Sequence, residues 1–191
     1  LWPADFLIEV VYLLSASRLR SNVKIVNAGD KPLPWGLGTH PYFNVPILAG
    51  GDATQSQVQV PANEYWELQD FIPTGRKITV DQRLDLRSGA KLQERPLDDV
   101  LTGLKISDGQ TEAKVIDKSL GYTVTQIADA IFRECVVFTP PNRSCVCLEP
   151  YTCTTNAINL QQQGIDAGWR VLPPGAEFHT WIEIVVSPNS K

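Results

Sequence analysis

Apolar and polar residues alternate with a period of two along most of the chain, which indicates β-strands rather than helices. Residues 6–13 form one such segment. In residues 18–25, apolar Leu19, Val23 and Ile25 interleave with arginine, asparagine and lysine, so this segment predicts a strand with one face in water. The two segments are expected to be neighbouring strands joined near Ser15–Ser17, and Asn27–Asp30 follows them as a turn signal.

Short strands are predicted along the rest of the chain as well. They cover residues 56–60, 77–80, 101–106, 113–116, 122–127, 135–139, 144–148 and 178–186. The chain contains 14 prolines and 13 glycines that punctuate these segments, and helical character is confined to a turn or two at 156–163. Many short strands at close spacing predict an all-β protein, a sandwich or a barrel. Neither a repeat nor a linker divides residues 1–191, so we expect a single domain.

The charge balance narrows the choice of partners. The 17 basic and 21 acidic residues give a net charge of -4, which disfavours a nucleic-acid partner. The longest apolar run, Val10–Leu14, is the length of a strand and too short to span a membrane. We therefore expect neither nucleic acid nor a membrane as a partner.

The four cysteines, Cys135, Cys145, Cys147 and Cys153, all lie in the last third of the chain. Cys145 and Cys147 are two apart on a predicted strand, so they face the same side and are poorly placed to bond to each other. The chain has no CxxC pair, so a zinc site is not expected. Free, mostly buried thiols are typical of a reducing compartment, and we expect a cytoplasmic location.

The two histidines differ in their surroundings. His179 lies in the predicted strand beside Trp181, where a solvent-facing structural role is expected. His40 lies in the segment 35–43, between two glycines and Pro41, and the proline holds His40 in an extended conformation. A histidine among glycines and aromatic residues at a strand end suits a sugar or another small polar ligand. A ring that simply bonds a backbone carbonyl is an equal alternative.

Glu149 is the second candidate for chemistry. It ends the predicted strand 144–149, and alternation places it on the face of Cys145 and Cys147. A carboxylate beside two small, soft side chains is partly desolvated, which raises its pKa and makes it a better general base. The structural alternative is a salt bridge to Arg143 or Arg170.

Weaker signals come from an acidic pair and from the aromatic residues. Asp98 and Asp99 are typical of a solvated loop, although Asp98 also suits hydrogen bonds to sugar hydroxyls. Aromatic rings can stack on a sugar ring, and five are candidates for this role: Trp35, Tyr42, Trp66, Tyr151 and Trp169.

Several of these segments, in this order, resemble the aldose 1-epimerases, which are also called galactose mutarotases. The resemblance rests on residues 27–34, 36–43, 73–75, 97–100, 137–140, 148–152 and 168–175, and it extends from about Phe6 onward. Its most specific parts are the His-Pro-Tyr-Phe stretch at 40–43, with the turn before it, and the Glu-Pro-Tyr-Thr stretch at 149–152.

The resemblance implies an antiparallel β-sandwich with a sugar cleft on its sheet surface. It also implies Glu149 as the general base, His40 as the general acid and Asp98 as a carboxylate that holds ring hydroxyls, with Tyr42 and Tyr151 as further substrate contacts. The expected reaction interconverts the α and β anomers of a free aldohexose. It requires no metal, nucleotide or other cofactor.

One departure from the family pattern concerns the amino terminus. The family carries an amino-terminal half with further strands, an arginine and another histidine that contact the sugar, and this chain matches none of it. The chain also lacks methionine and opens with Leu1-Trp2-Pro3. We expect residues 1–191 to be the carboxy-terminal part of a longer protein and to have little activity alone, a processed amino terminus being the alternative.

Three other functions are consistent with parts of the sequence. An epimerase of hexose 6-phosphates needs a basic cluster, for which Arg76-Lys77 and 83–87 are available. A glycosidase would use Asp98 and Glu149 as paired carboxylates but leaves His40 without a role. A carbohydrate-binding module on the same scaffold would need the aromatic residues but not the pair of His40 and Glu149.

Overall fold

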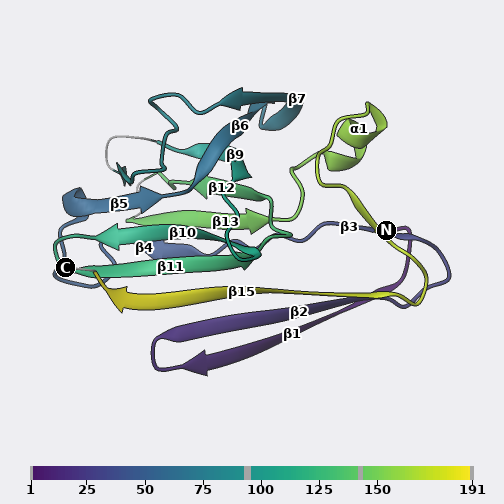
Figure 1. The fold of residues 1–191 in the computed structure, drawn as a ribbon, viewed down its shortest axis with the longest axis horizontal. Helices are drawn as coiled ribbons and strands as arrows, with labels where there is room; N and C mark the ends of the chain where they lie inside the picture. The colour runs from purple at the N-terminus through teal and green to yellow at the C-terminus, as the bar shows by residue number, and fades with distance from the viewer. Residues whose placement is uncertain (1, 93–95, 142–143, 190–191) are drawn as a thin grey trace.

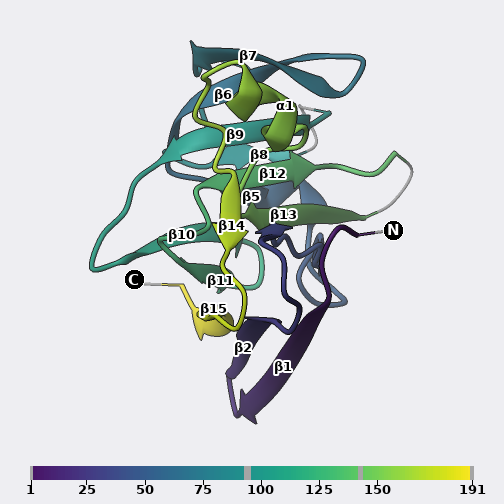
Figure 2. The ribbon, with the colours of Figure 1, turned by 90° about the vertical axis from the view of Figure 1, so that its right-hand side faces the viewer.

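Two antiparallel sheets make up most of the computed structural model, which describes residues 2–92, 96–141 and 144–189. The larger sheet has the strand order β1 (Phe6–Ser15), β2 (Arg18–Asn27), β15 (Glu177–Pro188), β11 (Tyr122–Asp129), β10 (Gln110–Asp117), β5 (Ser56–Gln59) and β8 (Ala90–Lys91). The second sheet has the order β4 (Tyr42–Asn44), β13 (Cys145–Tyr151), β12 (Glu134–Phe138), β9 (Asp98–Leu104), β6 (Ala62–Gln69) and β7 (Ile72–Thr79). A separate pair joins β14 (Arg170–Leu172) to β3 (Leu33–Trp35). Figure 1 labels β3, and Figure 2 labels β14.

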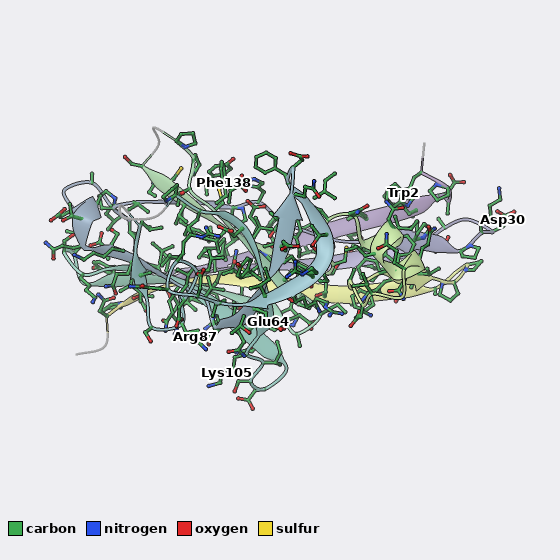
Figure 3. All side chains as sticks on the ribbon, turned by 90° about the horizontal axis from the view of Figure 1, so that it is seen from above. Trp2, Asp30, Glu64, Arg87, Lys105 and Phe138 are labelled. Atoms are coloured by element: carbon green, nitrogen blue, oxygen red, sulfur yellow. The ribbon has the colours of Figure 1, made fainter. Side chains whose placement is uncertain are left out.

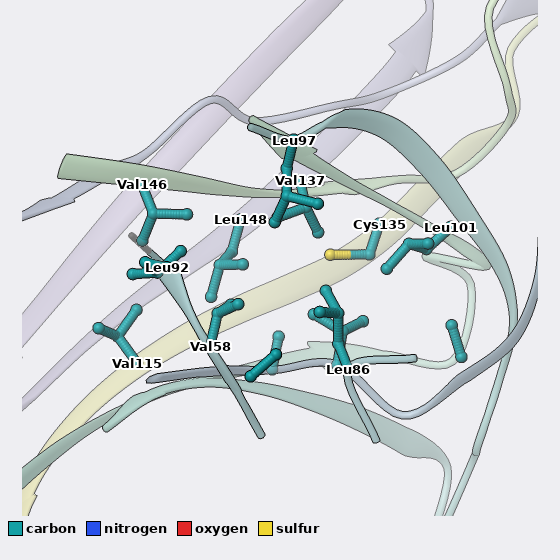
Figure 4. Packing of buried hydrophobic residues seen from close by; sticks show 14 of the residues in the cluster. Val58, Leu86, Leu92, Leu97, Leu101, Val115, Cys135, Val137, Val146 and Leu148 are labelled. Atoms are coloured by element: carbon teal, nitrogen blue, oxygen red, sulfur yellow. The ribbon is translucent and has the colours of Figure 1, made fainter. Parts of the chain in front are cut away.

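The main core lies between the two sheets. Val58 and Val115 enter it from the larger sheet, and Val137, Val146 and Leu148 enter it from the second sheet (Figure 4). All five are at most 1% exposed. Full burial of a Val or Leu side chain stabilises a fold by about 1.5–3 kcal/mol, so these alternating positions fix which face of each strand points inward. The predicted all-β antiparallel sandwich is confirmed.

Alternation located the longer strands but missed the short or polar ones. The hairpin of β1 and β2 turns at residues 16–17, as predicted, and β5, β10, β11, β12 and β15 lie on the predicted segments. The strands β3, β4, β6, β8 and β14 were not predicted. The helix α1 (Ala157–Gln162) follows Asn156 in the segment where a turn or two was expected, and residues 53–55 form a short 3-10 turn.

The first strand lies at the edge of the larger sheet. It pairs with β2 along its whole length, and all ten of its residues are exposed (Figure 1). The hairpin therefore adds little to the main core, although the inward residues of β2 join a second cluster around Leu33 and Trp35.

The outer face of the second sheet is partly covered by the segment that follows β13. There α1 and the residues after it pack over the sheet in a cluster of Trp66, Val100, Ala157, Leu160 and Ala167. Within the described ranges, the structure has no helix long and apolar enough to cross a membrane. The part of this outer face that α1 leaves uncovered includes the carboxyl end of β13, which is where the candidate site lies.

Candidate active site

Strand β13 divides its side chains between the core and the outer face of the sheet. Val146 and Leu148 point into the core, so Cys147 and Glu149 point to the opposite face. This arrangement follows the predicted alternation. The prediction that the strand ends at Glu149 was wrong, because β13 continues through Pro150 to Tyr151 and pairs with β12 over this stretch.

The segment before His40 is held against the end of β13. Gly38 forms an isolated antiparallel bridge with Tyr151, and the Thr39 amide donates to the Pro150 carbonyl at 3.3 Å. A Cβ atom on Gly38 would lie only 2.6 Å from carbon atoms of the Tyr151 ring. Glycine is therefore needed at position 38 so that the tyrosine ring can pack directly on the backbone.

Glu149 is buried and is held by two polar partners. Its Oε1 atom lies 3.1 Å from His40 Nε2, and its Oε2 atom accepts a hydrogen bond of 3.0 Å from the Tyr151 hydroxyl. The Glu149 side chain is 3% exposed and that of His40 is 47% exposed. The pair therefore joins a buried carboxylate to an imidazole that solvent can reach.

Burial sets the protonation behaviour of this carboxylate. It raises the pKa of Glu149 above the ordinary glutamate value, although the Tyr151 hydrogen bond and His40 act in the opposite direction. Burial and the neighbouring charge of Glu149 raise the pKa of Tyr151 to about 12, so this phenol remains a hydrogen-bond donor at neutral pH. The result is a carboxylate of increased basicity with a fixed donor on one oxygen.

Tyr42 and Cys147 complete the immediate surroundings of the pair. Strand β4 places Tyr42 opposite Cys147, and the Tyr42 ring stacks on His40 with a centroid distance of 4.9 Å and an interplanar angle of 20°. The Cys147 side chain is fully buried, and burial raises the pKa of its thiol to about 12. All four cysteines of the chain are free thiols.

Asp98 lies further along the same face. It begins β9, and alternation puts it on the side of Val100, which belongs to the outer cluster. Strand β12 separates it from β13. Its negative charge contributes to the raised pKa of Glu149, and partial burial together with Asp99 raises the pKa of Asp98 itself.

A pocket of about 420 Å³ adjoins the pair and is lined by His40 and Tyr151. Its other walls come from distant parts of the chain: residues 35–36, 38–39 and 153–158, Trp2 and Trp169. Figure 3 shows Trp2 beside α1, at the end of the molecule where this pocket lies. A pocket of this size with aromatic walls and a few polar groups is typical of a small-molecule site.

The pocket corrects one aromatic prediction. Trp35, Tyr151 and Trp169 line it, but Tyr42 and Trp66 do not. Trp66 is 1% exposed beneath α1, and its indole nitrogen donates to Glu134 Oε2 at 3.0 Å. A sugar therefore cannot stack on Trp66.

The alternatives for the charged candidates can also be compared with the structure. The contacts of Glu149 are with His40 and Tyr151 rather than Arg170, and Arg143 lies outside the described residues. His179 has a side chain that is 62% exposed and pairs with Glu177 at 2.9 Å, as suits a structural surface residue.

Sequence reasoning missed two features of the site. Cys147 was placed on the correct face, but its proximity to His40 depends on the pairing of β13 with β4, which spacing alone does not reveal. The role of Gly38 in packing Tyr151 was also missed. Its signal was present in the glycine pattern before His40, but the partner ring could not be identified from the sequence.

Comparisons with known proteins agree with the fold and give the family. Three solved structures are similar in fold. A galactose mutarotase-like protein from Clostridium acetobutylicum has a TM-score of 0.86 and 21% identity, and the match covers 98% of this chain and 57% of that chain. An aldose epimerase homologue from C. elegans has a TM-score of 0.80 and 20% identity, with 99% of this chain and 62% of that chain covered. A protein from Synechocystis sp. PCC 6803 has a TM-score of 0.73 and 26% identity, with 98% of this chain and 57% of that chain covered. The chain thus spans less than two thirds of the length of these proteins. The family profile described as aldose 1-epimerase matches residues 1–185. The chain belongs to the aldose 1-epimerase family.

Proposed function

We propose that this chain provides the acid–base pair of an enzyme that interconverts the α and β anomers of a free aldohexose. The observation that carries the proposal is the 3.1 Å contact between His40 Nε2 and Glu149 Oε1 beside an aromatic pocket. Each positioned proton transfer is typically worth about 10²–10⁴ in rate. The family to which the chain belongs supports the same reaction class.

Exchange at C1 needs two coordinated proton transfers. Glu149 removes the proton of the C1 hydroxyl while protonated His40 donates a proton to the ring oxygen O5, so the C1–O5 bond breaks and an aldehyde forms. Rotation about the C1–C2 bond presents the other face of the carbonyl. The reverse transfers then close the ring as the other anomer and restore both side chains.

The contact between the two side chains must open when a sugar binds, since the C1 hydroxyl and O5 have to lie between them. Glu149 is buried on a strand and hydrogen-bonded to Tyr151, whereas the His40 side chain is half exposed. His40 is therefore the member expected to move. Such rearrangement is common, because catalytic hydrogen bonds often reach their productive geometry only in the substrate complex.

The neighbouring residues are assigned supporting roles in this proposal. Tyr151 keeps Glu149 oriented through its hydroxyl. Tyr42, stacked on His40, and Asp98, on the same sheet face, provide contacts for the sugar hydroxyls. These positions are consistent with a substrate that lies across the outer face of the second sheet.

The ion pairs of the three candidate arginines favour a neutral sugar over a sugar phosphate. Arg76, Arg83 and Arg87 pair with Glu67, Asp99 and Asp85 at 3.1, 2.8 and 2.7 Å, respectively. A guanidinium that already pairs with a carboxylate is a poor receptor for a phosphate. A glycosidase is less favoured, because it leaves the contact of Glu149 with His40 without a role.

The test compares Glu149→Gln with a matched surface variant, Glu112→Gln, whose side chain is half exposed and pairs with Lys114. NMR exchange spectroscopy on glucose and on galactose measures anomer exchange above the spontaneous rate, and calorimetry measures sugar binding. We expect Glu149→Gln to lower the exchange rate by about 10²–10⁴ and to preserve most of the binding, while Glu112→Gln changes neither.

Three outcomes would contradict the proposal. If Glu149→Gln leaves both rate and binding unchanged, Glu149 is structural. If the unaltered protein binds sugar but accelerates no exchange, a binding module is favoured. Release of reducing sugar from an aryl glycoside would favour a glycosidase.

We also propose that the 191 residues form one domain that is the carboxy-terminal part of the functional unit. The chain covers 57% and 62% of two structural relatives, which supports a functional unit longer than 191 residues. Anomer exchange should therefore be slower for the 191-residue chain than for a protein of the relatives' full length. Equal activity in a side-by-side measurement would contradict this expectation.

A further inference from the structure

A thiol lies against the proposed acid–base pair and is not used by it. One potential ligand atom each from His40, Cys147 and Glu149 lie within 4.8 Å of one another. Cys147 and Glu149 point to the same face of β13, and His40 approaches them from the segment before β4. An imidazole nitrogen, a sulfur and a carboxylate oxygen are the three ligand types that zinc takes in proteins.

We propose that His40, Cys147 and Glu149 form a binding site for Zn²⁺ in which His40 is the ligand that lines the pocket. Bonds of about 2.0–2.3 Å in a tetrahedral site hold neighbouring ligand atoms about 3.3–3.8 Å apart. The separation of up to 4.8 Å must therefore shorten by about 1 Å on binding. The half-exposed His40 side chain can move toward the sulfur without disturbing the strand.

The charge balance favours a divalent ion at this place. Coordination releases the Cys147 thiol proton to solvent and leaves a thiolate, a carboxylate and a neutral imidazole, whose two negative charges a divalent cation neutralises. Calcium and magnesium prefer sites made of oxygen ligands, so the sulfur and nitrogen ligands select a softer ion such as zinc.

Occupation by zinc has a consequence that rests on the proposed function. The metal coordinates the His40 nitrogen and a Glu149 oxygen, which are the atoms proposed to transfer protons. Zinc binding and sugar turnover therefore exclude each other, and zinc acts as a reversible inhibitor. The metal site itself can be tested without any measurement of turnover.

Cobalt provides the direct test, because a thiolate bound to Co²⁺ gives a charge-transfer absorption band. The band is expected in the unaltered protein and to disappear when Zn²⁺ displaces Co²⁺. Cys147→Ser should abolish the band and weaken zinc binding, measured by calorimetry, by at least about 10- to 100-fold. The matched control is Cys145→Ser, since Cys145 is a partly buried thiol on the same strand and face but outside the cluster.

A second variant, at the more exposed ligand, separates loss of zinc binding from loss of the fold. His40→Gln changes a half-exposed residue, and it should also weaken zinc binding while circular dichroism remains native. The proposal is overturned if the unaltered protein gives no thiolate–cobalt band, if Cys147→Ser or His40→Gln binds zinc normally, or if Cys145→Ser loses the band.

Turnover provides a separate readout. In a preparation that catalyses anomer exchange, added Zn²⁺ should slow exchange in the unaltered protein and in Cys145→Ser, and a chelator should restore it. Cys147→Ser should resist inhibition. If exchange is absent but the cobalt band is present, the epimerase proposal fails and the metal site stands. If exchange is normal but no metal binds, the metal-site proposal fails and the epimerase proposal stands.

Discussion

Replacing Tyr151 by phenylalanine removes the hydroxyl that donates to Glu149 Oε2 at 3.0 Å and keeps the ring that packs on Gly38. A hydrogen bond to a charged group contributes about 1.5–3 kcal/mol. Only the excess over a hydrogen bond to the protonated acid, about 1 kcal/mol, acts on the pKa, so loss of this bond should raise the pKa of Glu149. The base would then hold its proton at a pH where the unaltered protein has already lost it.

The sign of the effect on rate follows from the proposed role. A general base works only when deprotonated, so a higher pKa moves the acid limb of the pH–rate profile to higher pH. Tyr151, with a pKa of about 12, does not itself titrate near neutral pH. We expect the acid limb of Tyr151→Phe to shift toward alkaline pH by up to about one pH unit, with a smaller change in the plateau rate.

The assay is anomer exchange measured by NMR across the pH range, with a chelator present to keep the site free of metal. Tyr122→Phe is the matched control, because Tyr122 is partly exposed on β11 of the other sheet. Its profile should coincide with that of the unaltered protein. An acid limb that stays in place in Tyr151→Phe, or moves to lower pH, would show that the hydroxyl does not stabilise an ionised Glu149.

Two further changes test the packing of the site and the pH dependence of stability. In Gly38→Ala the new Cβ would lie 2.6 Å from the Tyr151 ring, and displacement of that ring by about 1 Å should slow anomer exchange by roughly 10- to 100-fold; an unchanged rate would contradict this packing argument. The pKa of Glu134 is raised by burial, so the folded state binds its proton more tightly than the unfolded state, and stability should fall as pH rises from the ordinary glutamate pKa through the raised value. Urea unfolding measures this slope, which Glu134→Gln should reduce; an equal slope in the variant would assign the pH dependence to other groups.

Some parts of the fold could be predicted from the sequence because burial enforces alternation. In β10 every second residue is buried, and the pattern of Ala113 and Val115 marks the strand directly. Strand β6 escaped prediction because Trp66 is buried among polar neighbours such as Glu64 and Glu67. The end of β13 was misplaced because Pro150 resembles a strand terminus, whereas its carbonyl accepts the Thr39 amide and the strand continues.

In the candidate site, too, local patterns could be predicted from the sequence and long-range pairing could not. Alternation correctly placed Glu149 on the face of Cys147, since that inference needs only local geometry. The contact with His40 depends on how the glycine segment runs beside the end of β13, a long-range pairing that no local pattern specifies. The motifs around His40 and Glu149 identified the residues, and the structure supplied the distance between them.

The most direct test is a structure of the Glu149→Gln variant with a bound aldohexose, in which loss of the base slows turnover of the bound sugar. We predict that residue 149 lies within about 2.6–3.2 Å of the C1 hydroxyl and that His40 Nε2 lies within the same range of the ring oxygen O5. A sugar that occupies the pocket beside Trp35 and Trp169 with C1 and O5 away from both residues would contradict the proposed acid–base pair.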